Sequence, residues 1–354
     1  MKILSFSCRD FRNLHNIEIN SFDEMNVICG ENAQGKTNLL EGIWLFTGIK
    51  SFRGAKDSAF VRVGCEKAEL NILFSAEGIE NEAEIEIKEH RTVLFNNNKL
   101  KTPSLMAGKF NATVFSPNDL GLVRDGPAVR RRFLDIAIGQ LYPSYISALK
   151  NYMRAVTQRN QIIKDYRYDS TLSVMLDVFE EEIAANGVKI TEIRRKYIER
   201  LGEYLPQVYN GLSSGKESLE TEYISSCGEE ELRQSLLNAR KNDMFTGTTS
   251  IGPHRDDIEF KINGISARSF GSQGQKRSVA LALKLAEAEV IKKISGEYPV
   301  FLLDDVMSEL DPERQNYILN HIKGIQSFIT CCDPSNVERL KKGKIFEIRN
   351  GRIV

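Results

Sequence analysis

Alternation of apolar and polar positions predicts that the first third of the chain is rich in β-strands. Residues 2–8 and 16–19 alternate, and residues 25–29 form a short apolar run. A helix is expected over 37–46, where leucine and isoleucine recur at helical spacing. Residues 92–100, with three asparagines at their centre, are typical of a hairpin. Trp44 falls inside the predicted helix and is expected in the core.

The pattern changes to helical spacing in the middle of the chain, where glycine becomes scarce. Residues 175–185 and 189–205 are predicted to be further helical runs. The acidic triplet Glu180–Glu182 is expected to face solvent. We therefore predict a mainly helical arm over residues 118–245.

The last part of the chain returns to an α/β pattern. Residues 258–262 alternate, 279–294 form a mostly apolar helix, and 299–303 are a continuous apolar run typical of parallel strands. Residues 327–330 and 346–348 are predicted to be further strands. We expect residues 1–117 and 246–354 to form one α/β domain into which the arm, 118–245, is inserted.

Composition restricts the possible functions. The chain has 354 residues, with 48 lysines and arginines against 48 acidic residues, so any nucleic-acid binding must come from a local basic patch. Its six cysteines form no C-x-x-C pair and there are only four histidines, which makes a zinc site unexpected. Adjacent Cys331 and Cys332 are more typical of a reducing compartment. Without a cleavable leader pattern or a run of ~18 apolar residues, we expect a cytoplasmic protein.

Residues 30–37 fit the pattern G-x-x-x-x-G-K-[ST] and stand between a predicted strand and a predicted helix. Glycines let backbone N–H groups turn toward phosphate oxygens, and the positive end of the following helix points to the same anion. Lys36 can then reach the terminal phosphates, and Thr37 can place its hydroxyl on Mg²⁺. The alternative is a glycine-rich turn with an exposed lysine. The predicted nucleotide-binding residues are Gly30, Glu31, Asn32, Ala33, Gln34, Gly35, Lys36, Thr37 and Asn38.

Two aspartates, Asp304 and Asp305, directly follow the predicted buried strand at 299–303. Ligands of open α/β sheets collect at the carboxyl ends of the strands. We expect Asp304 to hold Mg²⁺, directly or through water, and Asp305 to orient or deprotonate an attacking water. The alternative is a pair of turn-forming or helix-capping aspartates.

A third motif, S-x-G-Q at residues 272–275, precedes the predicted apolar helix. A small hydroxyl-bearing residue with glycine at a helix start can bind an anion, although an ordinary serine N-cap has the same composition. The position of the S-x-G-Q motif among the other motifs makes it significant. Along the chain, the phosphate loop comes first, then S-x-G-Q, then the acidic pair, and then S-x-L-D at 308–311.

This order of motifs resembles that of ABC-type ATPase heads, and within them the chain is similar to the RecF family. The similarity to the RecF family covers nearly the whole chain. It is carried by residues 10–13, 30–38, 51–53, 115–117, 130–135, 158–160, 252–257, 271–277 and 303–306. The fold it implies is α/β: an ABC-type P-loop ATPase head with a mixed β-sheet, plus an inserted, mainly helical lobe. The arm is too short for the long coiled coil of chromosome-maintenance proteins.

The resemblance also implies a function. It implies an ATP-dependent DNA-binding recombination and repair mediator, a weak ATPase that uses ATP and Mg²⁺ as a switch. ATP would lie between two copies, with Ser272, Gly274 and Gln275 acting in trans on the partner's nucleotide. Lys36, Ser272 and Asp305 would carry catalysis. The implied partners are gapped, single-stranded or double-stranded DNA, a second copy, RecO and RecR, and through them the RecA recombinase; no membrane is implied.

Two features depart from the general ABC pattern. Asp305 stands where most ABC ATPases carry glutamate; an acidic pair of this form is usual in the RecF family and is consistent with slow hydrolysis. Residues 330–333, Thr-Cys-Cys-Asp, lack the histidine of transporter heads. The sequence therefore leaves open which group senses the γ-phosphate on that side.

Other polar residues carry weaker signals. Arg12 resembles an N-terminal arginine that helps hold nucleotide, or it is a surface arginine; His254 either organises the site or is structural. Cations in the middle of the chain can meet DNA phosphates, or they form a solvated face or pair with acidic helices. These candidate DNA contacts are Arg130, Arg131, Arg132, Lys150, Arg154 and Arg159. Alternative functions are the ATPase subunit of an ABC transporter or of a nuclease complex.

Overall fold

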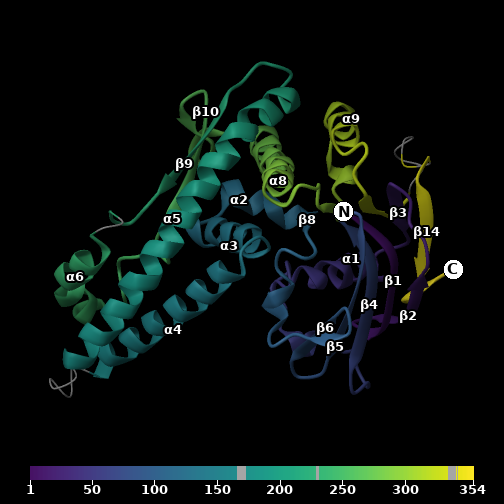
Figure 1. Ribbon diagram of the computed structural model, residues 1–354. Coiled ribbons are helices and arrows are strands. Elements are labelled where there is room, and N and C mark those ends of the chain that lie inside the picture. Colours follow the sequence, from purple (N-terminus) through teal and green to yellow (C-terminus); the bar gives the residue numbers. More distant parts are fainter. Residues whose placement is uncertain (166–172, 229–230, 334–339, 341) are drawn as a thin grey trace.

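The structure, a computed structural model, describes residues 1–165, 173–228, 231–333, 340 and 342–354. A head containing two large sheets stands beside a long arm of paired helices, as Figure 1 shows. Strands from the two ends of the chain lie together in the head, whereas the middle of the chain forms the arm. This arrangement agrees with the α/β fold class; the domain bounds 1–117, 118–245 and 246–354 stay a prediction.

One six-stranded sheet, in the order β15-β14-β3-β13-β12-β8, combines strands from both ends of the chain. The five strands from β14 to β8 pair in parallel, and β15 pairs antiparallel with β14. The central strands are apolar and almost wholly buried, because parallel strands are covered on both faces. The strands are β3 (Met25–Cys29), β8 (Ala112–Phe115), β12 (Val300–Leu303), β13 (Ser327–Cys331), β14 (Lys344–Arg349) and β15 (Arg352–Ile353). The predicted strands at 25–29, 299–303, 327–330 and 346–348 are thus confirmed.

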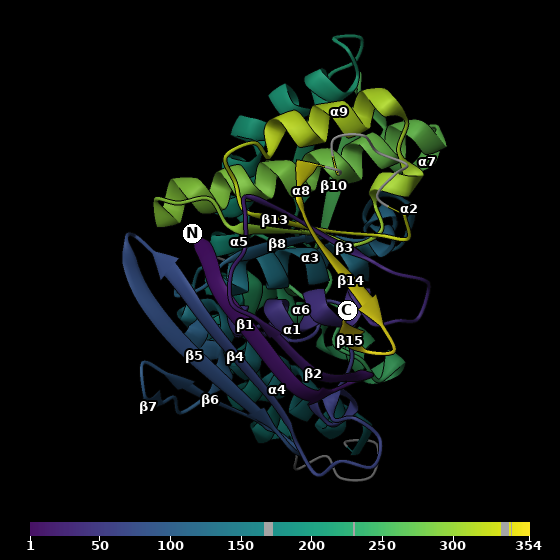
Figure 2. The same cartoon turned by 90° about the vertical axis from the view of Figure 1, so that its right-hand side faces the viewer.

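The second six-stranded sheet is antiparallel, in the order β2-β1-β4-β5-β6-β7 (Figure 2). Its strands alternate between buried and exposed positions, as expected of a sheet with one face in the core. The hairpin predicted within 92–100 is formed by β6 and β7. The strands are β1 (Lys2–Phe11), β2 (Leu14–Ile19), β4 (Ala68–Ala76), β5 (Ile79–Ile87), β6 (Arg91–Phe95) and β7 (Asn98–Lys99).

Helix α1 (Lys36–Trp44) packs in the core that these two sheets share. Trp44 is fully buried there, as predicted, and its indole N–H donates to the Lys50 carbonyl at 3.0 Å. The helix is shorter than the predicted 37–46, because its last residues tighten into a 3₁₀ turn that ends at Gly48. Gly48 has a φ of 77°, a conformation that glycine adopts without steric cost.

A third, three-stranded sheet has the order β11-β10-β9 and consists of β9 (Leu219–Ile224), β10 (Asp257–Ile262) and β11 (Ile265–Ser266). Strand β9 lies in the segment predicted to be helical, so that prediction is wrong for these residues. The alternation of Leu219, Thr221 and Tyr223 with exposed glutamates was a signal for it.

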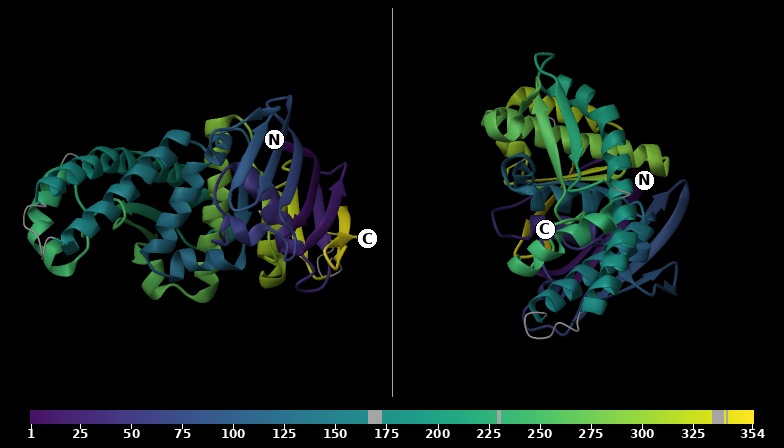
Figure 3. Two further views of the ribbon diagram at one scale, coloured as in Figure 1. Left: turned by 90° about the horizontal axis from the view of Figure 1, so that it is seen from below. Right: turned by 90° about the vertical axis from the view of Figure 1, so that its left-hand side faces the viewer.

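Helices α4 and α5 form the long axis of the arm, with α6 packed against both (Figure 3). Helix α5 is one continuous helix of 40 residues that contains both of the predicted helical runs, 175–185 and 189–205. Gly187 does not break it; a Cβ there would lie 2.5 Å from the Leu232 side chain, so the glycine permits close packing of α6. The helices are α2 (Gly121–Arg124), α3 (Pro127–Gly139), α4 (Pro143–Asp165), α5 (Ser173–Leu212), α6 (Leu232–Thr246), α7 (Ala267–Phe270), α8 (Gln273–Ser295) and α9 (Pro312–His321).

Helix α5 also packs against α8, and its end reaches α9, so the arm is joined to the head along a buried surface. Among the described residues, no helix combines the length and the apolarity that a membrane span needs.

Candidate nucleotide-binding site

The predicted phosphate loop connects the end of β3 at Cys29 to the start of α1 at Lys36. Gly30 and Gly35 have φ values of 150° and 118°. A Cβ on Gly30 would lie 2.4 Å from the Ile348 carbonyl oxygen, and one on Gly35 would lie 2.5 Å from a Leu14 methyl. Both positions therefore need glycine for the backbone to turn and for neighbouring groups to approach.

The Lys36 side chain is only 7% exposed, which rules out the alternative of a turn with an exposed lysine. Its Nζ donates to the Gly30 and Glu31 carbonyls at 2.6 and 3.0 Å and lies 3.7 Å from the Cys332 Sγ. The ammonium is thus held over the loop by neutral oxygen acceptors. A phosphate in the loop would offer it a stronger, charged partner.

Side chains outside the loop fix its conformation. Asn13 donates its amide to the Ala33 carbonyl at 2.9 Å and accepts from Asn38 at 2.7 Å. The Gln34 carbonyl accepts from the Gly351 N–H at 3.2 Å. Because Asn13 follows β1 and Gly351 lies in the final hairpin, the cradle is ordered by both ends of the chain.

Thr37, in the first turn of α1 after β3, and Asp304, directly after β12, come together at the edge of the sheet where β3 and β12 end on either side of β13. The Thr37 hydroxyl donates to Asp304 Oδ1 at 2.8 Å, and the Thr330 hydroxyl donates to the same oxygen at 3.0 Å. Burial raises the pKa of Asp304 even though the hydrogen bonds from Thr37 and Thr330 lower it. The carboxylate is therefore unfavourable without a cation.

These oxygens fit Mg²⁺, which is bound by one or two protein oxygens together with substrate phosphates rather than by an all-protein cage. Thr37 Oγ1 and Asp304 Oδ1 would hold it. The described residues contain no group of three or more histidine, cysteine or acidic side chains that could hold a metal ion.

The backbone of Asp305 is in the left-handed region, with a φ of 53°. Its N–H donates to the Thr330 hydroxyl at 2.8 Å, and the Ser308 hydroxyl donates to its carbonyl at 3.0 Å and its Oδ1 at 3.2 Å. Asp305 is half-buried, so one carboxylate is buried beside Thr37 and the next is accessible to water.

Glu41 is a polar residue of this site that the sequence analysis did not identify. It is fully buried on α1, where it pairs with Arg12 at 2.7 Å, lies 3.7 Å from Arg53 and accepts a hydrogen bond from Ser51. Arg53 also donates to Asn38 in the loop at 3.1 Å. Arg12 and Arg53 are thereby positioned beside the cradle. A glutamate on the apolar side of a predicted helix was the available signal.

The S-x-G-Q segment caps the start of α8. Ser272 Oγ accepts from the Gln275 N–H at 3.2 Å, and the Gln275 side-chain oxygen accepts from the Ser272 N–H at 2.7 Å. The Gln275 amide also donates to Glu217, at the end of the arm, at 2.7 Å. Because Ser272 Oγ is the acceptor in its bond, its O–H remains able to donate. The segment therefore combines a serine cap with a hydroxyl and a helix N-terminus suited to an anion.

This segment opens onto a cavity of about 900 Å³. The cavity is lined by Leu212, Ser213, Ser214, Lys216, Glu217, Ser272, Gly274, Gln275, Ser278, Asp311, Pro312, Glu313 and Arg314. None of the described residues of the phosphate loop, 30–38, lines it. The loop and the S-x-G-Q segment of one chain thus face different spaces.

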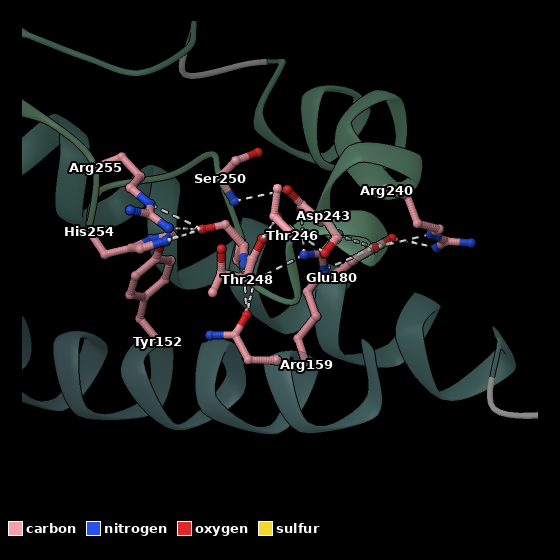
Figure 4. A network of polar contacts seen from close by, with 12 residues as sticks. Tyr152, Arg159, Glu180, Arg240, Asp243, Thr246, Thr248, Ser250, His254 and Arg255 are labelled. Carbon is pink, nitrogen blue, oxygen red and sulfur yellow. Dashed lines mark hydrogen bonds and ion pairs between the residues drawn. The ribbon is translucent and has the colours of Figure 1, made fainter. Parts of the chain in front are cut away.

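Two of the six candidate DNA contacts are structural, which corrects the prediction for Arg130 and Arg159. Arg130 is 2% exposed and forms a two-pronged ion pair with Asp257, at 2.6 and 2.9 Å. Arg159 is fully buried between Glu180 and Asp243, at 2.9 and 2.7 Å (Figure 4). Glu180 is therefore a core residue, and the expected solvent exposure of Glu180–Glu182 is wrong for it. The spacing of the cations did not reveal these partners, which come from distant segments.

The remaining candidates lie nearer the surface. Lys150 and Arg154 are exposed on α4. Arg132 is exposed and donates to the Ser51 and Phe52 carbonyls at 3.0 Å, and half-buried Arg131 donates to the Asp256 carbonyl at 2.8 Å.

His254 lies against α4 of the arm rather than at the phosphate loop. Its ring contacts the Tyr152 hydroxyl at 2.5 Å and the Thr249 carbonyl at 3.0 Å (Figure 4). Burial lowers its pKa. These contacts support the structural interpretation of His254.

A phosphate loop and an acidic strand end, joined across a parallel sheet, define a P-loop ATPase head. Residues 2–352 match the family described as "RecF/RecN/SMC N terminal domain". The chain belongs to the RecF family of DNA replication and repair proteins. It is 39% identical to the protein of that name from Clostridium acetobutylicum, with 100% of this chain and 99% of the relative covered. A Bacillus cereus relative is 37% identical, with 100% and 98% covered.

Solved structures agree with this assignment. A recombination mediator RecF of the RecFOR pathway, solved with ATP, superposes with a TM-score of 0.92 at 36% identity, covering 100% of this chain and 97% of that one. The Smc head domain from Pyrococcus furiosus has a TM-score of 0.56 at 16% identity and covers 100% and 96%, which shows a shared fold. Membership of the RecF family argues against the transporter alternative.

Proposed function

We propose that this protein is an ATP-dependent DNA-binding mediator of recombination and repair, in which two copies close on ATP. One observation carries the proposal: the S-x-G-Q segment faces a cavity that contains none of the described residues of its own phosphate loop. A nucleotide held by one copy needs a second copy to meet this segment. Ser272, Gly274 and Gln275 would therefore act in trans.

The residues of the loop divide the work on ATP. The backbone of residues 30–35 cradles the phosphates, Lys36 neutralises the terminal ones, and Arg12 assists from the Glu41 cluster. Thr37 and Asp304 hold Mg²⁺, whose charge offsets that of the phosphates. Asp305 is accessible to water and would orient the attacking molecule or take its proton. Hydrolysis by this weak ATPase would then reopen the dimer.

DNA binding requires local cations, because the chain has 48 basic and 48 acidic residues. Arg131, Arg132, Lys150 and Arg154 are the remaining candidates. Closure of two copies would join two weak basic surfaces into one, so that DNA binding would depend on ATP. Gapped or junction DNA is the proposed target. RecO and RecR are the proposed partners, and loading of RecA the proposed outcome, in a cytoplasmic setting.

The test is fluorescence anisotropy of labelled gapped DNA at near-physiological salt, titrated with protein in ATP, in ADP and without nucleotide. Ser272→Arg is the matched variant, because it fills the trans cavity and leaves the chain's own phosphate loop intact. We expect DNA binding with ATP alone, and its loss in Ser272→Arg with ATP affinity unchanged. Equal binding in all nucleotide states would refute control by ATP.

A further inference from the structure

We propose that Arg314 binds a phosphate of the nucleotide held by a second copy of this chain. Arg314 lies in the first turn of α9, directly after the S-x-L-D motif, and lines the cavity of about 900 Å³ beside the S-x-G-Q segment. The inference rests on the proposed function, in which two copies close on ATP. It adds an oriented cation to the S-x-G-Q side of the ATP site, where Ser272 offers a hydroxyl and the start of α8 offers backbone N–H groups.

The guanidinium is held in place by two elements. Its Nε donates to the Ser278 hydroxyl on α8 at 2.9 Å, and its Nη1 pairs with the Asp311 carboxylate. The backbone N–H of Arg314 donates to the same carboxylate at 3.0 Å, so Asp311 both caps α9 and orients the Arg314 side chain. Burial acts to raise the pKa of Asp311, but the Arg314 backbone and side-chain hydrogen bonds outweigh it and lower that pKa.

The remaining nitrogen of Arg314, Nη2, faces Gly274, the glycine of the S-x-G-Q segment. It lies 3.8 Å from the point that a Cβ on Gly274 would occupy, and the Ser272 Oγ lies 3.9 Å from the same point. Nη2 has no hydrogen-bond partner within the part of the chain that the structure describes. A hydroxyl donor and a guanidinium donor therefore flank one glycine, leaving space where an anion can approach the backbone.

Charge chemistry favours Arg314 over the other cation of this cavity. Lys216 also lines the cavity, but it is exposed on the loop after α5, and no hydrogen bond or ion pair of its side chain is found among the described residues. An arginine that is already oriented loses less side-chain entropy on binding, and its planar fork matches a phosphate. Lys216 is therefore the matched control: the same cavity and the same charge, without the fixed orientation.

The test compares Arg314→Ala, Arg314→Lys and Lys216→Ala in the full chain. Binding of a fluorescent ATP analogue is measured at protein concentrations that keep the wild type monomeric. Dimerisation is then measured by sedimentation equilibrium with ATPγS and with ADP. Thermal unfolding of each variant confirms that the fold is retained.

We expect Arg314→Ala to bind nucleotide as the wild-type monomer does. Its ATPγS-dependent dimerisation should weaken by a factor of about 10 to 100, the value of a charge-assisted hydrogen bond. Arg314→Lys should recover part of this loss. Lys216→Ala should change the strength of ATPγS-dependent dimerisation less than threefold. Ser278→Ala removes the Nε partner but keeps the charge, so it should weaken dimerisation less than Arg314→Ala.

Two results would overturn the inference. One is dimerisation of Arg314→Ala at wild-type strength; the other is an equal loss in Ser278→Ala, which would make Arg314 a structural link between α8 and α9. A wild type that stays monomeric with ATPγS would instead refute the proposed function itself. The two failures are therefore distinguishable in one set of measurements.

Discussion

The Thr37 hydroxyl and the Asp304 carboxylate lie 2.8 Å apart, although 267 positions separate them in the chain. The contact exists because β3 and β12 both pair with β13 in parallel, which brings their carboxyl ends to one edge of the sheet. Thr330, at the end of β13, completes the group by donating to the same Asp304 oxygen at 3.0 Å. The metal-holding residues are thus positioned by sheet topology.

Asp304→Asn should separate stability from metal binding. Burial raises the pKa of Asp304, so its charged form is costly in the nucleotide-free protein, and a neutral amide should raise the melting temperature. The same change should weaken Mg²⁺-dependent ATP binding by at least the ~10- to 100-fold that loss of an outer-shell partner costs. Calorimetry without nucleotide and titration with Mg-ATP measure the two effects. A lower melting temperature would contradict the assigned cost of the charge.

The raised pKa of Asp304 also predicts a pH dependence. A folded-state pKa above the ordinary value means that the folded protein binds more protons, so nucleotide-free stability falls as pH rises through the raised pKa. Mg²⁺ needs the carboxylate form, so Mg-ATP binding should weaken on acidification, starting at a higher pH than for an ordinary aspartate. Titrations across pH, with Asp304→Asn as the insensitive control, test this. The prediction fails if both proteins have the same pH profile.

Lys36→Ala should weaken ATP binding by about 10- to 100-fold, since one charge-assisted hydrogen bond to phosphate is lost. ADP binding should weaken less, because the ammonium is expected to reach the terminal phosphates. Lys50→Ala, an exposed lysine after α1, is the control and should change neither affinity. Equal losses for ATP and ADP would place the ammonium on an inner phosphate instead.

The phosphate loop and the acidic pair could be predicted from the sequence because their chemistry is local. The glycines at 30 and 35 indicate turns with a positive φ, which the structure has at both positions. Asp304 follows a strand whose apolar composition indicates that it is buried. The strands that meet around them follow the same rule of apolar runs and alternation. For these residues, the pattern and the structure coincide.

Partners from distant segments could not be predicted in this way. Arg159 has the pattern of a solvated cation on α4, yet its partners lie on α5 and α6. Glu41 looks like an interruption of an apolar helix, but it pairs with Arg12 and Ser51, which come from other elements. Such residues depend on tertiary packing, which hydrophobic periodicity does not encode.

Asp305→Asn should slow ATP hydrolysis by about 10²- to 10⁴-fold, the usual contribution of a general base. The carboxylate takes no part in the Thr37 contact, so ATP binding should be retained. With hydrolysis slowed, the ATP-bound dimer should persist longer, which gel filtration at intervals after ATP addition can follow. Unchanged turnover would remove Asp305 from the catalytic role and direct attention to Ser308, which donates to it.

Arg159 and Arg154 lie on the same helix and should respond to alanine in opposite ways. Arg159 is fully buried with Glu180 and Asp243, so its removal leaves the Asp243 carboxylate without its cation and leaves Glu180 paired with Arg240 alone. Breaking a buried pair in this way costs about 3–5 kcal/mol, so Arg159→Ala should lower the midpoint of urea unfolding. Arg154 is exposed, so Arg154→Ala should leave that midpoint unchanged.

DNA binding should show the complementary result. If Arg154 contacts a phosphate, its loss should weaken ATP-dependent DNA binding for all sequences alike and reduce the salt dependence by about one ion. Lys150→Ala, one turn earlier on α4, should also weaken DNA binding and reduce its salt dependence. If both residues face the same DNA strand, the losses of binding free energy should add in the double variant. Anisotropy titrations at several salt concentrations measure the slope. A salt slope unchanged in the double variant would exclude this face of α4 from the DNA interface and leave Arg131 and Arg132, at the base of the arm, as the remaining cations to test.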